Sequence, residues 1–141
     1  MALSVKQVDV WQGHVGDQPG QLAEGLATLS AAGADFEFIL ARRDDQSPGK
    51  SIVFVAPVKG ARQTRAAAKA GLRKSKQVFA VRVEGDDQRG LAAGITRAIG
   101  AAGVNIRGFA GRVLGDGVGI YVSVESKKDA ATAVKAIKAL R

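Results

Sequence analysis

Two short segments of the sequence combine residue types that suit the binding of a small zwitterion. They are Asp17-Gln18-Pro19-Gly20 and Asp87-Gln88-Arg89-Gly90, and each precedes an apolar pattern of helical spacing. Unpaired N–H groups at a helix start, together with the positive end of the helix dipole, favour a carboxylate. Glycine has no Cβ, so a ligand can approach the backbone there. Both segments are therefore candidate loops for holding a carboxylate.

An ammonium group needs acceptors, and each half of the sequence offers one at a matching place. Asp35 and Asn105 each follow the loop glycine by 15 residues, where the next strand is expected to begin. We expect this strand start to lie near the loop, with Asp17 and Asp87 as further acceptors. The alternative is that such loops only start helices, with Asp as a cap.

Other site chemistries find little support. The chain has no cysteine and a single histidine, His14, which excludes disulfides and thiolate zinc sites and leaves no second histidine for a metal set. We expect no cofactor. Residues 1–9 lack a long apolar core, and no later apolar run approaches the roughly 20 residues that span a bilayer. A cytoplasmic location and no membrane contact are expected.

An internal repeat sets the organisation of the chain. Four matches share an offset of 70 residues: Lys6-Gln7-Val8 with Lys76-Gln77-Val78, Gly20 with Gly90, Gly33 with Gly103, and Arg42 with Arg112. After Arg42 the offset is 68, which pairs Ile52 with Ile120 and Thr64 with Thr132. The repeat predicts two domains, residues 1–75 and 76–141.

Each repeat predicts the element order β-α-β-β-α. Extended segments 5–11 and 78–83 are followed by a polar loop and then by a helix with apolar residues at i, i+4 and i+7: Leu22, Leu26 and Leu29, or Leu91, Ile95 and Ala98. Hairpins are predicted from strands 36–42 with 51–57, and 104–114 with 118–124. A second helix closes each repeat, with Ala130, Val134, Ile137 and Leu140 as its buried stripe in the last one. The fold class is α+β, two tandem ferredoxin-like units with antiparallel sheets packed side by side.

A ferredoxin-like unit ends in a fourth strand, which this order lacks. Residues 72–76 are expected to leave no room for one, and the second repeat ends after its helix. The first strand of each repeat would then have a bare edge, which proteins rarely leave uncovered. We expect pairing between the two repeats, or between two chains, to cover it.

With both copies in register, the chain resembles the ACT domain family, in particular small proteins with two tandem copies. The motif residues are 86–92 with Gly103-Val104-Asn105-Ile106, and 16–23 with Gly33-Ala34-Asp35-Phe36. The resemblance implies a regulatory protein without catalysis, which binds a free amino acid at a domain or subunit interface, forms a dimer and acts on a separate enzyme or regulator. It implies these ligand-binding residues: Asp17, Gln18, Gly20, Leu22, Asp35, Phe36, Asp87, Gln88, Gly90, Leu91, Asn105 and Ile106.

Two rival functions come from other features. The net charge of +8 and the ferredoxin-like pattern suggest a nucleic-acid-binding module. However, residues 61–76 hold six basic residues and no acid, so much of the excess positive charge lies on a predicted helix. A helix face that is exposed to solvent accounts for this charge without a nucleic acid. Gln12-Gly13-His14-Val15-Gly16 is similar to the phosphate loop of acylphosphatases, but residues 17–20 supply no cation for an anionic substrate. We expect His14 to be a loop residue without a catalytic role.

Overall fold

A computed structural model describes residues 3–140 and divides them into two compact units. The first unit is formed by residues 9–75. The second unit is formed by residues 3–8 together with residues 76–140. Each unit has its own sheet, its own pair of helices and its own core.

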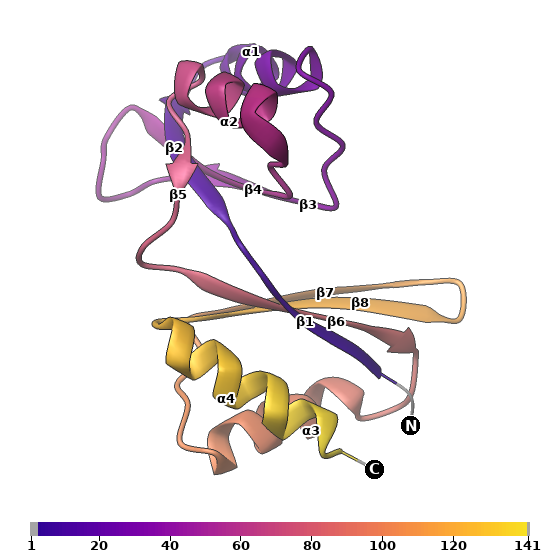
Figure 1. Ribbon diagram of the computed structural model, residues 1–141. Helices are drawn as coiled ribbons and strands as arrows, with labels where there is room; N and C mark the ends of the chain where they lie inside the picture. Colours follow the sequence, from indigo (N-terminus) through magenta and orange to yellow (C-terminus); the bar gives the residue numbers. More distant parts are fainter. Residues whose placement is uncertain (1–2, 141) are drawn as a thin grey trace. The chain divides into compact units, whose positions relative to one another are not determined.

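The first unit is a four-stranded antiparallel sheet with two helices on one face (Figure 1). Its sheet order is β3-β4-β2-β5. The elements in chain order are β2 (Trp11–Gly16), α1 (Gln21–Ser30), β3 (Phe38–Arg43), β4 (Lys50–Ala56), α2 (Gly60–Lys69) and β5 (Arg73–Lys74).

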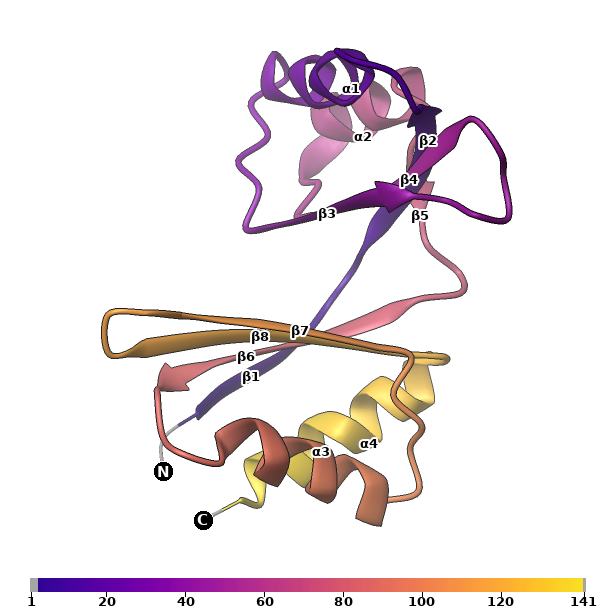
Figure 2. The ribbon, with the colours of Figure 1, turned by 180° about the vertical axis from the view of Figure 1, so that it is seen from behind.

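The second unit repeats this arrangement with longer strands, as Figure 2 shows for the β7–β8 hairpin. Its sheet order is β1-β6-β8-β7. The elements are β1 (Leu3–Val8), β6 (Phe79–Asp86), α3 (Leu91–Ala101), β7 (Gly108–Leu114), β8 (Gly117–Val124) and α4 (Lys127–Lys138). The predicted α+β class with ferredoxin-like units and antiparallel sheets is confirmed.

Strand alternation builds both cores. In β6 and β8, every second residue points to the helices, and the buried ones are Val81, Val83, Ile120, Val122 and Val124. Helices α3 and α4 close this core with Ile95, Ile99, Ala133 and Ile137. The first unit has a smaller core of Leu29, Val53, Val55, Ala67 and Leu72. None of the helices within residues 3–140 is long and apolar enough to cross a membrane.

The first strand departs from the expected organisation. The extended segment predicted over residues 5–11 is broken at Asp9 and Val10, and the two parts enter different sheets. Strand β1 pairs antiparallel with β6, with Val5 opposite Val83, and Val5 is buried in the core of the second unit. The expected domain range of 1–75 is therefore corrected for this strand, which folds with residues 76–140.

The fourth strand of each sheet comes from two different sources. Strand β1 covers the edge of β6, which confirms the expected pairing between repeats. In the first unit the two-residue strand β5 pairs with β2, so the expectation that residues 72–76 leave no room for a strand was wrong. The Ser75 hydroxyl anchors this end by donating to the Gln12 side-chain carbonyl at 2.5 Å, and both residues are buried.

Candidate functional site

The two candidate loops end in the same backbone geometry. Gly20 and Gly90 adopt φ values of +86° and +81° and immediately precede α1 and α3. A positive φ disfavours residues with a Cβ, so the loop conformation itself requires glycine here. A Cβ added at either position would meet no described atom within 4 Å. The space beside both helix starts is open.

Neither helix start is capped by a side chain of the described residues. By contrast, the Ser126 side chain accepts a hydrogen bond from the Asp129 N–H at the start of α4. The first turns of α1 and α3 therefore keep N–H groups that an external acceptor can use. This arrangement suits a carboxylate, because the helix dipole adds a partial positive charge at the same place.

Each candidate loop is fastened to the hairpin of its own sheet. The Asp17 N–H donates to the Gly49 carbonyl at 3.0 Å, and the Asp87 N–H donates to the Asp116 carbonyl at 2.7 Å. Both contacts join the loop before the first helix of the unit to a hairpin turn, that of β3–β4 in the first unit and that of β7–β8 in the second. The loop and the hairpin turn therefore form one end of each sheet.

The two loops differ in whether their aspartate is paired with a cation. In the first unit, Arg43 Nε donates to Asp17 Oδ2 at 2.6 Å, and this carboxylate raises the pKa of Arg43 through the hydrogen bond and the charge. In the second unit, the Asp87 side chain forms no ion pair with any residue of the described range. Asp87 thus remains available as an acceptor, whereas Asp17 is already engaged. Arg43 was not among the predicted site residues; its position at the end of a predicted strand, just before a turn, is the signal that could have indicated it.

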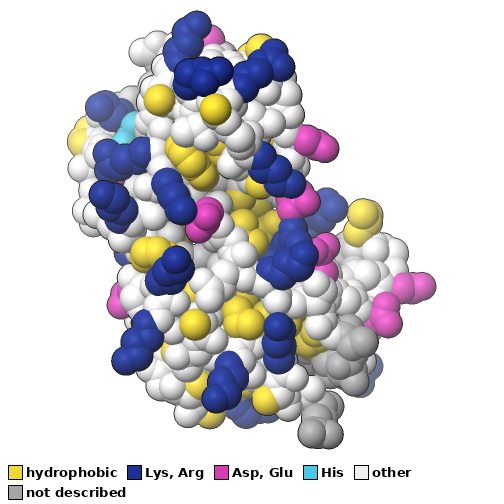
Figure 3. Space-filling view, viewed as in Figure 1, with side chains coloured by type: hydrophobic (Ala, Val, Ile, Leu, Met, Phe, Trp, Pro, Cys, Tyr) yellow, Lys and Arg dark blue, Asp and Glu magenta, His cyan; other side chains and the backbone are white. Residues whose placement is uncertain are grey.

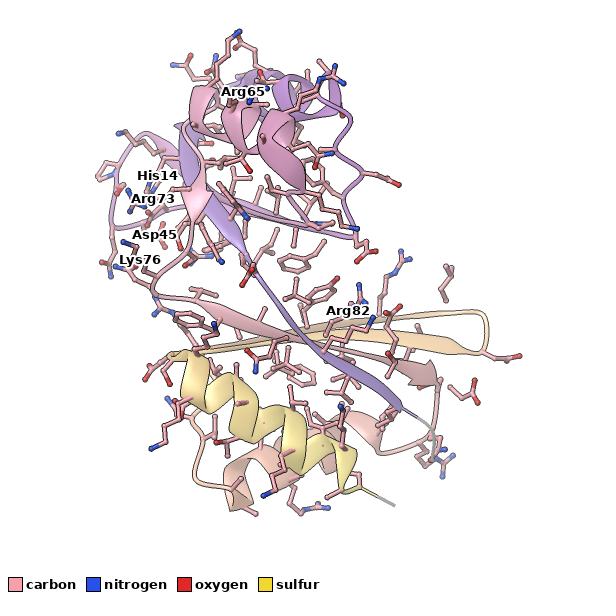
Figure 4. The ribbon with its side chains drawn as sticks, in the orientation of Figure 1. His14, Asp45, Arg65, Arg73, Lys76 and Arg82 are labelled. Atoms are coloured by element: carbon pink, nitrogen blue, oxygen red, sulfur yellow. The ribbon has the colours of Figure 1, made fainter. Side chains whose placement is uncertain are left out.

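His14 lies on β2, so the expectation that it occupies a loop was wrong. Its Nε2 is 2.8 Å from Asp44 Oδ2 (Figure 4 labels His14). The hydrogen bond with His14, followed by one from the Gln46 N–H, lowers the pKa of Asp44. This pair and the Asp17–Arg43 pair tie β2 and the loop that follows it to the β3–β4 hairpin. Sequence alone could not find these pairs, since each spans 26 to 30 residues.

The predicted acceptors Asp35 and Asn105 do not lie beside the loops of their own unit. Phe38, at the start of β3, is opposite Ala56, while Trp11, at the start of β2, is opposite Val55. The start of β3 is thus level with the start of β2, and the loop follows the far end of β2. With about 3.3 Å per residue, the two ends of β2 are roughly 17 Å apart.

The second unit shows the same separation. Gly108 is opposite Ser123, which is opposite Ala80 near the start of β6, whereas Asp86 before the loop is opposite Gly117. The expectation that strand start and loop meet within one unit is therefore corrected. The physical reason is that α1 and α3 carry the chain back along the whole sheet before the next strand begins.

Burial divides the remaining predicted residues into two groups. Leu91 is 5% exposed and lies in the core of the second unit, and Ile106 and Phe36 pack against the cores of their units. Leu22 is 36% exposed beside its loop, unlike the buried position expected from its helical spacing. Gln18, Gln88, Asp35 and Asn105 are exposed. The open part of the candidate site thus consists of the loop residues and, at the other end of each sheet, Asp35 or Asn105.

A metal centre has no support in this part of the molecule. Residues 3–140 contain no group of three or more His, Asp or Glu side chains placed to hold a metal ion. The chemistry available at the loops is the recognition of charge and hydrogen-bonding groups.

Comparisons with solved structures extend over nearly the whole chain. The regulatory subunit of aspartate kinase from Thermus thermophilus in its ligand-free form has a TM-score of 0.67 and 15% identity, with 98% of this chain and 95% of that chain covered. Protein BT0572 from Bacteroides thetaiotaomicron has a TM-score of 0.77 and 11% identity, with 95% and 90% covered. The regulatory subunit of aspartate kinase from Thermus flavus has a TM-score of 0.59 and 22% identity, with 97% and 94% covered. At these identities the likeness establishes the fold, including the tandem arrangement.

Comparison at the level of sequence identifies the second half. No curated protein matches the chain. Residues 79–141, which begin at β6, match the ACT domain family. The first unit has the same order of elements and the same glycine-started helix as the matched segment. Residues 79–141 therefore match the ACT domain family, and residues 9–75 repeat the fold of this matched segment.

Proposed function

We propose that the protein binds a free amino acid and regulates a separate partner according to whether this ligand is bound, without catalysing a reaction. The match of residues 79–141 to the ACT domain family supports a regulatory, ligand-sensing role. The observation that carries the choice of ligand is the uncapped start of α1 and α3 behind a left-handed glycine, which suits a carboxylate.

The ammonium group of the ligand requires acceptors within a few ångströms of the carboxylate site. In the second unit, Asp87 can serve directly because its side chain is not engaged by a described cation. In the first unit, Asp17 already accepts from Arg43. Asp35 and Asn105 lie at the opposite end of their own sheets, so they cannot serve the loop of their own unit.

A symmetric dimer brings these parts together. Strands β3 and β7 are sheet edges, and they expose Ile39 (47%), Leu40 (40%), Phe109 (39%), Val113 (56%) and Leu114 (70%). Long edges with apolar side chains favour pairing with another strand. If two copies of one edge pair antiparallel about a two-fold axis, the start of the strand in one copy lies level with its end in the other. Asp35 or Asn105 of one copy then approaches the loop of its partner.

The ligand is tested by a thermal-shift screen against the common amino acids. A ligand at 100 times its Kd stabilises the native state by about 2.7 kcal/mol, which corresponds to a rise of several degrees. Gly90→Val is expected to abolish the shift. Gly103→Val is the matched control, because Gly103 has a φ of +80°, is equally open and ends α3 instead of starting it. A shift that survives Gly90→Val but not Gly103→Val contradicts the placement.

The shared site is tested by mixing two inactive variants. Gly90→Val damages the loop of the second unit, and Asn105→Ala removes the acceptor. In a mixed dimer, one site combines both defects and the other combines an intact loop with an intact Asn105. Isothermal titration should therefore detect recovered binding in the mixture. A mixture that binds no more ligand than each variant alone would argue against a site shared between copies.

A further inference from the structure

Helix α2 presents a row of cations on its outward side. Ala67 is fully buried beneath it, and Gln63 and Ala66 are half-buried. Four residues are exposed and basic, and we refer to them as the α2 cationic face: Lys59, Arg62, Arg65 and Lys69. The spacing of 62, 65 and 69 places three of them on one side of the helix. Figure 4 labels Arg65 at α2, where it is exposed, and Figure 3 shows Lys and Arg side chains over the helical end of this unit.

Most of these charges have no ion-pair partner among residues 3–140. Residues 46–83 contain nine basic residues and no acidic one. Within the described residues, the side chains of Lys59, Arg65 and Lys69 form no ion pair, whereas Arg43, Lys74 and Arg82 pair with Asp17, Asp9 and Glu84. Arg62 differs, because it donates to the Ala31 carbonyl at 2.9 Å and is thereby held in place at the end of α1.

The arrangement disfavours the isolated helix. Like charges three or four residues apart repel one another, as Arg62, Arg65 and Lys69 do. The first turn of α2 has no acidic residue, and the Lys59 side chain does not cap it; the Gln63 side chain only accepts from the Lys59 N–H at 2.8 Å, so no charged group there complements the helix dipole. A helix that keeps such a pattern gains stability when a negatively charged surface lies against it.

The side chains beside the basic residues indicate which kind of negatively charged partner fits this face. Ala61, Thr64 and Ala68 lie among them, so the face is made of small side chains and cations. Single-stranded nucleic acids are held by aromatic side chains that stack on bases, and this face offers none. Arginine suits carboxylates because its planar group donates two parallel hydrogen bonds.

We propose that the α2 cationic face docks onto an acidic surface of a partner protein. The segment from residue 62 to residue 69 spans about 10 Å, the length over which carboxylates at i, i+4 and i+7 of a facing helix would lie. This inference goes beyond the proposed function, since it names the surface that meets the partner and does not require that any amino acid binds.

The test uses a defined probe and two charge-matched variants. The probe is a fluorescein-labelled helical peptide with Glu at i, i+4 and i+7, and its binding is followed by fluorescence anisotropy at low salt. The variants are Arg65→Glu/Lys69→Glu on α2 and Lys135→Glu/Lys138→Glu on α4, which change the net charge equally at exposed positions. We expect the α2 variant to weaken binding by about tenfold or more and the α4 variant by less than about threefold. The same peptide with Lys in place of Glu should bind the α2 variant better than the unaltered protein.

Three results would overturn the proposal. Equal weakening by both variants would mean attraction to the net charge alone. Absence of peptide binding at about 1 mM would mean that the face does not recognise carboxylates. Tighter binding of a ten-nucleotide single-stranded RNA, lost in the α2 variant only, would make the face a nucleic-acid surface. If the reversed variant fails to fold by circular dichroism, Arg65→Gln/Lys69→Gln replaces it, with the same expected direction.

Discussion

Replacing Val5 with alanine tests the exchange of the first strand. Val5 is 5% exposed, lies opposite Val83 and packs in the core of the second unit. The substitution removes two buried methyl groups and leaves a small cavity, which should cost about 2 kcal/mol of unfolding free energy. Because 1.4 kcal/mol is a factor of ten, amides that exchange by opening of this unit should lose about 30-fold of their protection.

Hydrogen exchange followed by NMR locates the effect. The amides of Val81, Val83 and Val122 should lose protection, while those of Val53 and Val55 in the first unit should keep it. Val53→Ala is the matched control, since Val53 is 2% exposed in the other core and the chemical change is the same. Loss of protection in the first unit on Val5→Ala, or an equal loss in both units, would refute the assignment of β1 to the sheet of β6.

Two further predictions concern the first unit. Ser75→Ala removes the hydrogen bond to the Gln12 carbonyl and leaves this buried acceptor without that donor, so urea unfolding should show a loss of about 1–3 kcal/mol; an unchanged midpoint would show that the contact is dispensable. The hydrogen bonds from His14 and the Gln46 N–H hold the pKa of Asp44 below its usual 3.8. These bonds therefore contribute fully to the free energy of unfolding above pH 3.8, and this contribution is lost as the pH falls through the lower folded-state pKa. A carboxyl titration by NMR should show this midpoint below 3.8, and the pH-dependent shift of the Gln46 amide should disappear in Asp44→Asn.

Local patterns were sufficient for most elements of the fold. Alternation in residues 79–83 predicted a strand with one buried face, and the i, i+4, i+7 spacing of Leu91, Ile95 and Ala98 predicted α3. The loop glycines were found because the same positions recur 70 residues apart. These features depend on interactions between near neighbours, which a sequence displays directly.

Burial was predicted less well where the repeats differ. Leu22 fits the helical stripe of α1 by spacing but is exposed, because the stripe that packs on the sheet is carried by Leu26 and Leu29. In the second repeat, Leu91 lies one position earlier relative to its glycine and is buried. A shift of one position turns a side chain by about 100° around a helix, which decides between core and solvent.

The amino-acid sequence by itself determined the repeat, the order of most elements, the glycine-started helices and the resemblance of residues 79–141 to the ACT domain family. Only the tertiary structure decided that β1 joins the second sheet, that Arg43 engages Asp17, and that Asp35 and Asn105 lie at the far end of the sheet from the loops of their own unit. The reason is that strand partners and register are set by contacts between residues far apart in the chain. A strand pattern specifies which face is apolar, and it leaves open which neighbour the edge will meet.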